Sequence, residues 1–175
     1  MATSTSATSP IDVCTRSLVL IGAQPITSFS DGSNEALVAV NLYEDTAQAS
    51  LVNTRWRFAV NQAVGNRLSD APTGRWTSAY QIPSDSLMIN AVTVNDVSIE
   101  YQIYGNFIFS NASVNDEVVI DYNFRQDENK WPSYFIQAVV YELSGHFALA
   151  LARNDQMSNN MFDKARFFMQ KARTL

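Results

Sequence analysis

The chain has 175 residues, 46% of them hydrophobic and 17% charged, with a net charge of −5 at pH 7. This length can bury a proper core, and we expect one domain with an insertion. The acidic balance argues against a general binder of nucleic acid or acidic membranes, and the single cysteine, Cys14, excludes an internal disulfide.

Residues 1–10 form a Ser/Thr/Ala-rich segment, which we expect to be a flexible N-terminal arm. It has no positive charge and no apolar run, so a soluble protein made in a cytoplasm is expected. Ser9, Pro10 and Asp12 then predict a helix start. Ile11, Cys14, Leu18 and Ile21 give that helix one apolar stripe, which favours Cys14 as a core residue over a reactive thiol.

A second helix is predicted to begin in residues 31–34 and to run to about Thr54. Its expected buried stripe consists of Ala36, Leu37, Val40, Tyr43, Ala47 and Leu51. Trp56 and Phe58 follow, and each is preceded by an arginine. Alternating arginine and aromatic residues can stack on nucleic-acid bases, but we favour two core aromatics with arginines at a rim or a subunit contact.

After a loop at residues 69–74, apolar residues repeat with period two, which predicts strands. Residues 88–94 and 97–104 are expected to form a hairpin that turns at Asn95-Asp96. Residues 107–109 and 117–124 are expected to form a second hairpin, with another strand near residues 76–82. Together they predict a small antiparallel sheet or barrel.

Trp131-Pro132 marks the return to helix, which continues to about Arg153 and is followed by a last helix. Each helix has one apolar stripe, and the sheet is too small to cover them all. The predicted fold class is therefore α+β: a bundle of about four helices from residues 11–75 and 130–175, with residues 76–129 as an inserted antiparallel β domain.

Charge is unevenly distributed along the chain. Residues 84–129 hold eight acidic residues and one basic residue, whereas residues 153–173 hold five basic and two acidic ones. Opposite charges of this kind suit contacts between subunits. The candidate interface residues are Arg55, Arg57, Arg166, Lys171 and Arg173.

Sequence motifs give little support for catalysis. His146 is the only histidine, the six glycines are scattered, and no acidic cluster has the spacing of a calcium loop. We therefore expect no catalytic residue, no cofactor and no metal site. A pair of carboxylates in a cell-wall glycan hydrolase is the remaining enzymatic alternative, for which Glu142 and Glu117 are the residues to test.

Several short motifs, in a fixed order, resemble one family. The turn Leu20-Ile21-Gly22-Ala23-Gln24-Pro25-Ile26 is similar to that family's leucine-glycine-x-x-proline-isoleucine turn, and Trp56-Arg57-Phe58-Ala59 to its tryptophan-x-phenylalanine-alanine segment. The residues that carry the resemblance as a structural motif are Gly22, Pro25, Ile26, Tyr43, Trp56, Phe58, Trp76 and Pro83. The family is the head-to-tail adaptor of short-tailed bacteriophages, of the tail tubular protein A or gatekeeper type.

The resemblance implies a structural protein of the virion, located in the tail or neck and assembled in the host cytoplasm. Its subunits would form a ring of about twelve copies between the portal protein and the tail nozzle protein. Genomic DNA would pass through the lumen during ejection without sequence-specific binding, and no membrane would be involved. The alternative, of a different structural class, is a tail-completion or head-completion protein at another level of the neck.

Overall fold

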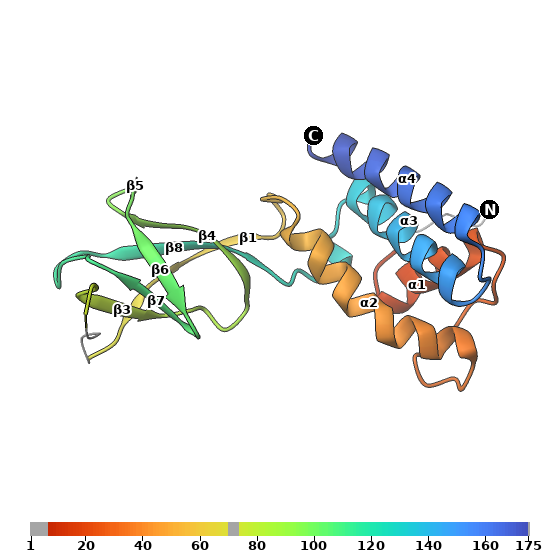
Figure 1. The fold of residues 1–175 in the computed structure, drawn as a ribbon, viewed down its shortest axis with the longest axis horizontal. Coiled ribbons are helices and arrows are strands. Elements are labelled where there is room, and N and C mark those ends of the chain that lie inside the picture. The colour runs from red at the N-terminus through yellow and green to blue at the C-terminus, as the bar shows by residue number, and fades with distance from the viewer. Residues whose placement is uncertain (1–6, 70–73, 175) are drawn as a thin grey trace. The chain divides into compact units, whose positions relative to one another are not determined.

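The computed structural model describes residues 7–69 and 74–174. Within these ranges the chain divides into two compact units (Figure 1). A helical unit is built from both ends of the chain, up to Thr54 and from Gln126 onward, and a β unit spans Arg55–Arg125. The architecture is α+β, as the sequence predicts. Most of the expected N-terminal arm lies outside the described residues.

Four α-helices make up the described part of the helical unit: α1 (Pro10–Leu20), α2 (Asn34–Val52), α3 (Ser133–Ala150) and α4 (Asp155–Ala172). The predicted start at Ser9 is confirmed, since its hydroxyl accepts from the Asp12 amide at 3.1 Å. The second helix begins within the predicted residues 31–34, and there the Ser33 hydroxyl accepts from the Ala36 amide at 3.1 Å. Asn154 caps α4 in the same way. These bonds satisfy amide groups that have no partner within their own helix.

Helix α3 is the centre of the helical unit, because α1, α2 and α4 all pack against it. Its core-facing side is wide and apolar, with Phe135, Val139, Leu143 and Phe147 fully buried. Gly145 lets α4 approach closely, since a Cβ atom there would lie 2.7 Å from the ring of Phe162. The short 3₁₀ helix η1 (Glu128–Lys130) leads into α3.

The buried side of α2 differs from the predicted stripe. Leu37 and Val40 were expected in the core, but they are 61% and 51% exposed. The buried stripe is made mainly of small residues, namely Ala36, Ala39, Tyr43, Thr46, Ala47, Ser50 and Leu51. Small side chains spaced three and four apart let α2 lie close to its neighbours, and this turns the two larger residues outward.

The β unit contains two four-stranded antiparallel sheets. One has the order β1-β8-β4-β5 and the other β2-β3-β7-β6. The strands are β1 (Val60–Val64), β2 (Asn66–Arg67), β3 (Ser78–Gln81), β4 (Ser86–Val94), β5 (Val97–Ser98), β6 (Tyr101–Tyr104), β7 (Phe107–Ser110) and β8 (Val118–Phe124).

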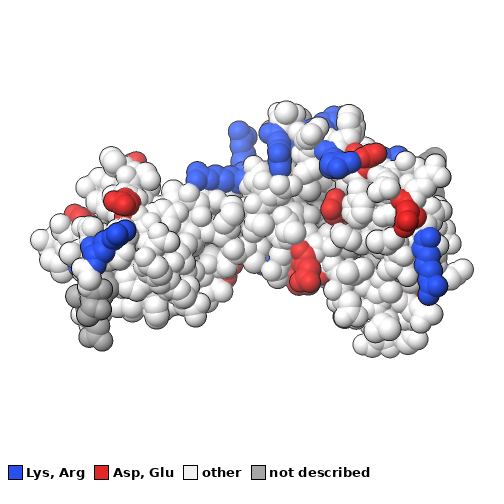
Figure 2. All heavy atoms as spheres, viewed as in Figure 1, with Lys and Arg blue, Asp and Glu red and all other residues white. Residues whose placement is uncertain are grey.

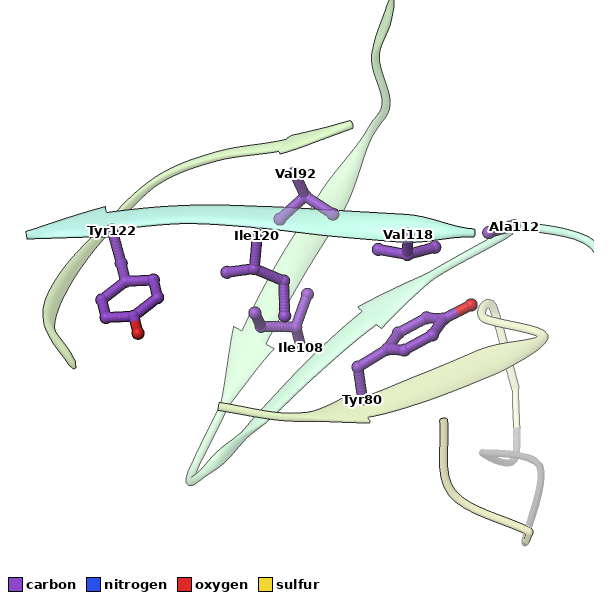
Figure 3. Close-up of a cluster of buried hydrophobic side chains, with 7 residues drawn as sticks. All are labelled: Tyr80, Val92, Ile108, Ala112, Val118, Ile120 and Tyr122. Atoms are coloured by element: carbon purple, nitrogen blue, oxygen red, sulfur yellow. The ribbon is translucent and has the colours of Figure 1, made fainter. Parts of the chain in front are cut away.

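The core of the β unit takes side chains from both sheets. Tyr80 and Ile108 come from one sheet, while Val92 and Ile120 come from the other, and all four are almost fully buried (Figure 3). In β7 and over most of β8, buried residues alternate with more exposed ones, which is the period-two pattern seen in the sequence.

The predicted strand pairing is wrong in two places. The segment 97–104 is not one strand, because β5 pairs with β4 whereas β6 pairs with β7 in the other sheet. The segments 107–109 and 117–124 do not pair with each other: β7 lies between β3 and β6, and β8 lies between β1 and β4. The turn at Asn95-Asp96 is confirmed, and both residues have the positive φ that a tight hairpin requires.

The boundary between the units also lies earlier than predicted. Residues 55–75 were assigned to the helical bundle, but the described part of this segment belongs to the β unit. The reason is that β1 pairs along its whole length with β8, with Val60 opposite Asn123 and Val64 opposite Val119. The second boundary falls at Arg125 instead of 129.

Candidate functional site

The turn after α1 is formed by residues that carry the family resemblance. Gly22 has a φ of +76°, a left-handed conformation that ends α1. The amides of Gly22 and Ala23 donate to the carbonyls of Val19 and Leu18. Ile26 is buried, and its carbonyl accepts from the Thr15 hydroxyl at 3.0 Å. Pro25 is exposed between these two anchors, so the turn is fixed from both sides.

A buried polar contact links α2 to the segment before α3. The Tyr43 hydroxyl donates to Oε1 of Glu128 at 2.5 Å, and both residues are buried. Burial, followed by the nearby charge of Glu128, raises the pKa of the Cys14 thiol to about 12. Cys14 is buried and unreactive at neutral pH, which confirms the core assignment. The sequence did not predict a buried role for Glu128.

The other motif residues lie in the β unit. Trp56 is 4% exposed and stacks on Phe58, with 6.0 Å between ring centroids. Burial of Trp56 confirms the interpretation as a core aromatic. Trp76 is buried as well, and Pro83 accepts a backbone hydrogen bond from Ser86 at 3.0 Å.

Two of the candidate interface residues, Arg166 and Lys171, lie on α4, and a third, Arg173, is the residue that follows it. Figure 2 shows basic side chains gathered on the side of the helical unit where Figure 1 places α4. Arg166 pairs with Asp163 one turn earlier, and Arg173 donates to the side chain of Asn53 at 2.6 Å. Lys171 is exposed and lines a groove on the helical unit. Contact with a partner remains a prediction for all three.

The other two candidates, Arg55 and Arg57, are both exposed. The Arg55 guanidinium donates to the backbone carbonyl of Asn90 at 2.6 Å, which fixes its direction over β4. It borders a depression of about 460 Å³ that also includes Asn61 and Asp121. Asp121 has a buried oxygen with no hydrogen-bond partner among the described residues.

The remaining ionisable cluster surrounds Glu142 on α3. With His146 one turn later and Arg166 on α4, it lines a cavity of about 260 Å³. Burial raises the pKa of Glu142, although the charges of His146 and Arg166 act in the opposite direction. His146 packs edge-on against Phe162 at 5.0 Å, as expected for a structural histidine. Glu117, the second acid of the hydrolase alternative, belongs to the β unit.

We expect Glu142→Gln to stabilise the protein near pH 7 relative to the natural chain, and to lose that advantage below about pH 4. The pKa of Glu142 is higher in the folded chain than its ordinary value of 4.5. Between these two pKa values the folded chain binds more protons than the unfolded chain, so the free energy of unfolding falls as the pH rises through this range. Glutamine cannot ionise and avoids this loss. Urea unfolding of both chains across this pH range measures the difference. Equal pH dependence of the two chains would contradict the prediction.

Comparison with known proteins identified no relative of this chain. No protein-family model matches the chain, and the search of curated proteins found no match. In residues 7–69 and 74–174, no group of three or more His, Cys, Asp or Glu side chains is placed to hold a metal ion. No helix within those same ranges combines the length and apolar character needed to cross a membrane.

The sequence did not predict that several apolar side chains of the helical unit are exposed. Leu37 and Val40 project from α2, while Val19 and Leu20 at the end of α1 are 58% and 42% exposed. The run of alanines on the other side of α2 was the available signal, since it offers a second stripe for burial. These exposed apolar side chains make the outer sides of α1 and α2 candidate contact surfaces.

Proposed function

We propose that this chain is a ring-forming structural subunit of a head-to-tail adaptor, which joins the portal protein of a short-tailed bacteriophage to its tail nozzle protein. DNA would pass through the lumen of the ring during ejection. The proposal covers assembly and channel formation and assigns no catalytic step to the chain.

The observation that carries the proposal is the position of the motif residues in the fold. Gly22 and Ile26 fix the turn between α1 and α2, and Tyr43 connects α2 to the segment before α3. Trp56 is buried just after the chain enters the β unit. Residues in such positions set the local geometry within each unit, and a closed ring requires the same geometry in every copy.

Two further observations support assembly. The helical unit exposes apolar side chains on α1 and α2, which are available for contact with another copy. Basic residues of α4 and acidic residues of α2 give the unit surfaces of opposite sign. Opposite charges steer copies toward one relative orientation.

The test is to mix the purified chain with portal protein and to examine the product by electron microscopy and light scattering. We expect either a ring of the chain alone or a ring seated on portal. Arg55→Ala and Arg57→Ala should weaken this assembly and leave the unfolding of the free chain unchanged, since both side chains are exposed.

Arg75→Ala is the matched control, because Arg75 is also an exposed arginine of the β unit. It should assemble like the natural chain. A chain that stays monomeric and inert toward both portal and nozzle protein would overturn the proposed function.

A further inference from the structure

A groove of about 750 Å³ runs between α1, α3 and α4 of the helical unit. Its walls include Val19, Leu20, Val140 and Phe168. The ring of Phe168 stacks on Tyr141 with centroids 5.2 Å apart and planes only 2° from parallel. The groove therefore offers a rigid, mostly apolar surface of a size that suits several apolar side chains.

The charged residues that line this groove are all basic. Arg16 from α1 and Lys171 from α4 belong to the lining, and no Asp or Glu is among the described lining residues. A further cation lies close by, since Nζ of Lys164 is 5.6 Å from the centre of the Tyr141 ring. The groove is suited to a helix that presents apolar side chains next to carboxylates.

Helix α2 has that surface. Leu37, Val40 and Glu44 are spaced three and four residues apart, so they share one side of the helix, and all three are exposed. The sequence of α2 contains three acidic residues, Glu35, Glu44 and Asp45, and no lysine or arginine. No α2 residue lines the groove of its own chain.

We propose that the outer side of α2 in one copy, defined by Leu37, Val40 and Glu44, docks into the α1–α3–α4 groove of a second copy. Leu37 and Val40 would enter the apolar part, and Glu44 would approach Lys171. The inference rests on the proposed ring function and names the contact through which neighbouring subunits would meet.

The two surfaces are different parts of the same unit, so the contact is head-to-tail. Each copy then offers one α2 and one groove. When two copies dock, one of them keeps an unoccupied α2 and the other keeps an unoccupied groove, so further copies can add at both ends. Repetition of such a contact gives a closed ring when the rotation per copy divides a full turn, and a filament when it does not. A two-fold dimer would instead need one surface to pair with itself.

Disulfide trapping tests the contact directly. One chain carries Leu37→Cys and the other carries Val19→Cys, each at an exposed position. The natural Cys14 does not compete, because it is buried and its pKa is raised to about 12. We expect a mixed disulfide dimer when the two chains are combined under mild oxidation, at a yield at least about ten times that of either chain alone.

Two outcomes would overturn the inference. Absence of the mixed dimer would show that the groove is not occupied by α2, and an equal yield from either chain alone would show a two-fold contact instead. Val114→Cys paired with Val19→Cys is the matched control, since Val114 is an apolar residue of the β unit that is 76% exposed. It should give only the background yield.

Charge reversal provides an independent measurement. Glu44→Lys or Lys171→Glu should each lower the yield of the mixed dimer about tenfold, and the two changes placed in facing chains should restore it. Glu117→Lys, at an exposed acid of the β unit, controls for net charge and should have no effect. Failure of the facing pair to restore the yield would count against the docking geometry.

These results separate the inference from the proposed function. Portal binding without the mixed dimer would overturn the inference and leave the adaptor function intact. A mixed dimer from a chain that binds neither portal nor nozzle protein would support the contact and overturn the adaptor function.

Discussion

Replacement of Trp56 with alanine is expected to lower the free energy of unfolding by about 3–5 kcal/mol. The indole is 4% exposed and stacks on Phe58, so truncation removes a large apolar contact and leaves a cavity. Urea unfolding followed by far-ultraviolet circular dichroism measures the change. The two compact units need not unfold in one transition, so the free energies of all observed transitions should be summed.

Phe167→Ala is the matched control for this experiment. Phe167 is an aromatic residue of α4 that is 60% exposed, so its truncation should cost less than about 1 kcal/mol. A loss below about 1 kcal/mol for Trp56→Ala would contradict the buried role. It would also restore the interpretation of Trp56 as a binding residue between two exposed arginines.

Tyr43→Phe should cost about 1.5–3 kcal/mol, the range for a hydrogen bond to a charged group. The hydroxyl that it removes donates to Glu128 at 2.5 Å, where both side chains are buried. Phenylalanine keeps the ring and its packing, including the contact with Phe29 at 6.1 Å. The loss therefore reports on the hydrogen bond, and denaturant unfolding of the variant measures it.

Two companion variants make the Tyr43 result specific. Tyr104→Phe changes a 54% exposed tyrosine and should alter stability by less than about 0.5 kcal/mol. Glu128→Gln keeps an acceptor for the Tyr43 hydroxyl and should cost less than Tyr43→Phe. Equal stability of Tyr43→Phe and the natural chain would show that this buried contact contributes nothing net.

Local sequence signals were sufficient for the helices. Ser9 was identified as a cap from side-chain chemistry alone, and the second helix was placed to begin in residues 31–34, where Ser33 accepts the capping amide bond. The turn at Asn95-Asp96 was predictable for the same reason, because asparagine and aspartate tolerate positive φ. In each case the information lies within a few residues of the feature.

Strand partners could not be predicted in this way, because pairing depends on residues distant in sequence. The ladder between β1 and β8 joins Val60 to Asn123, and nothing near either residue specifies the other. The change of sheet between β5 and β6 also leaves no clear mark, since apolar alternation continues from Val97 to Tyr104. Period-two alternation gives the buried side of a strand but not its neighbour.

The orientation of α2 was missed for a different physical reason. Leu37 and Val40 are more apolar than the alanines beside them, so a hydrophobicity pattern places them in the core. Close packing reversed this preference, because Ala36 and Ala39 fit against neighbouring helices where larger side chains would not. For the candidate interface residues, the sequence indicates that the basic side chains are exposed. It does not indicate which residues they contact.

The β1–β8 ladder also brings the two ends of the β unit together. The amide of Phe124 donates to the carbonyl of Ala59 at 3.0 Å, so the first and last strands of the β unit start and finish side by side. A segment whose two ends lie close together can be inserted into another unit with little disturbance, because the points where the chain leaves and re-enters that unit are also close together. A β unit of another length is therefore compatible with the same helical unit, provided that its two ends also lie side by side.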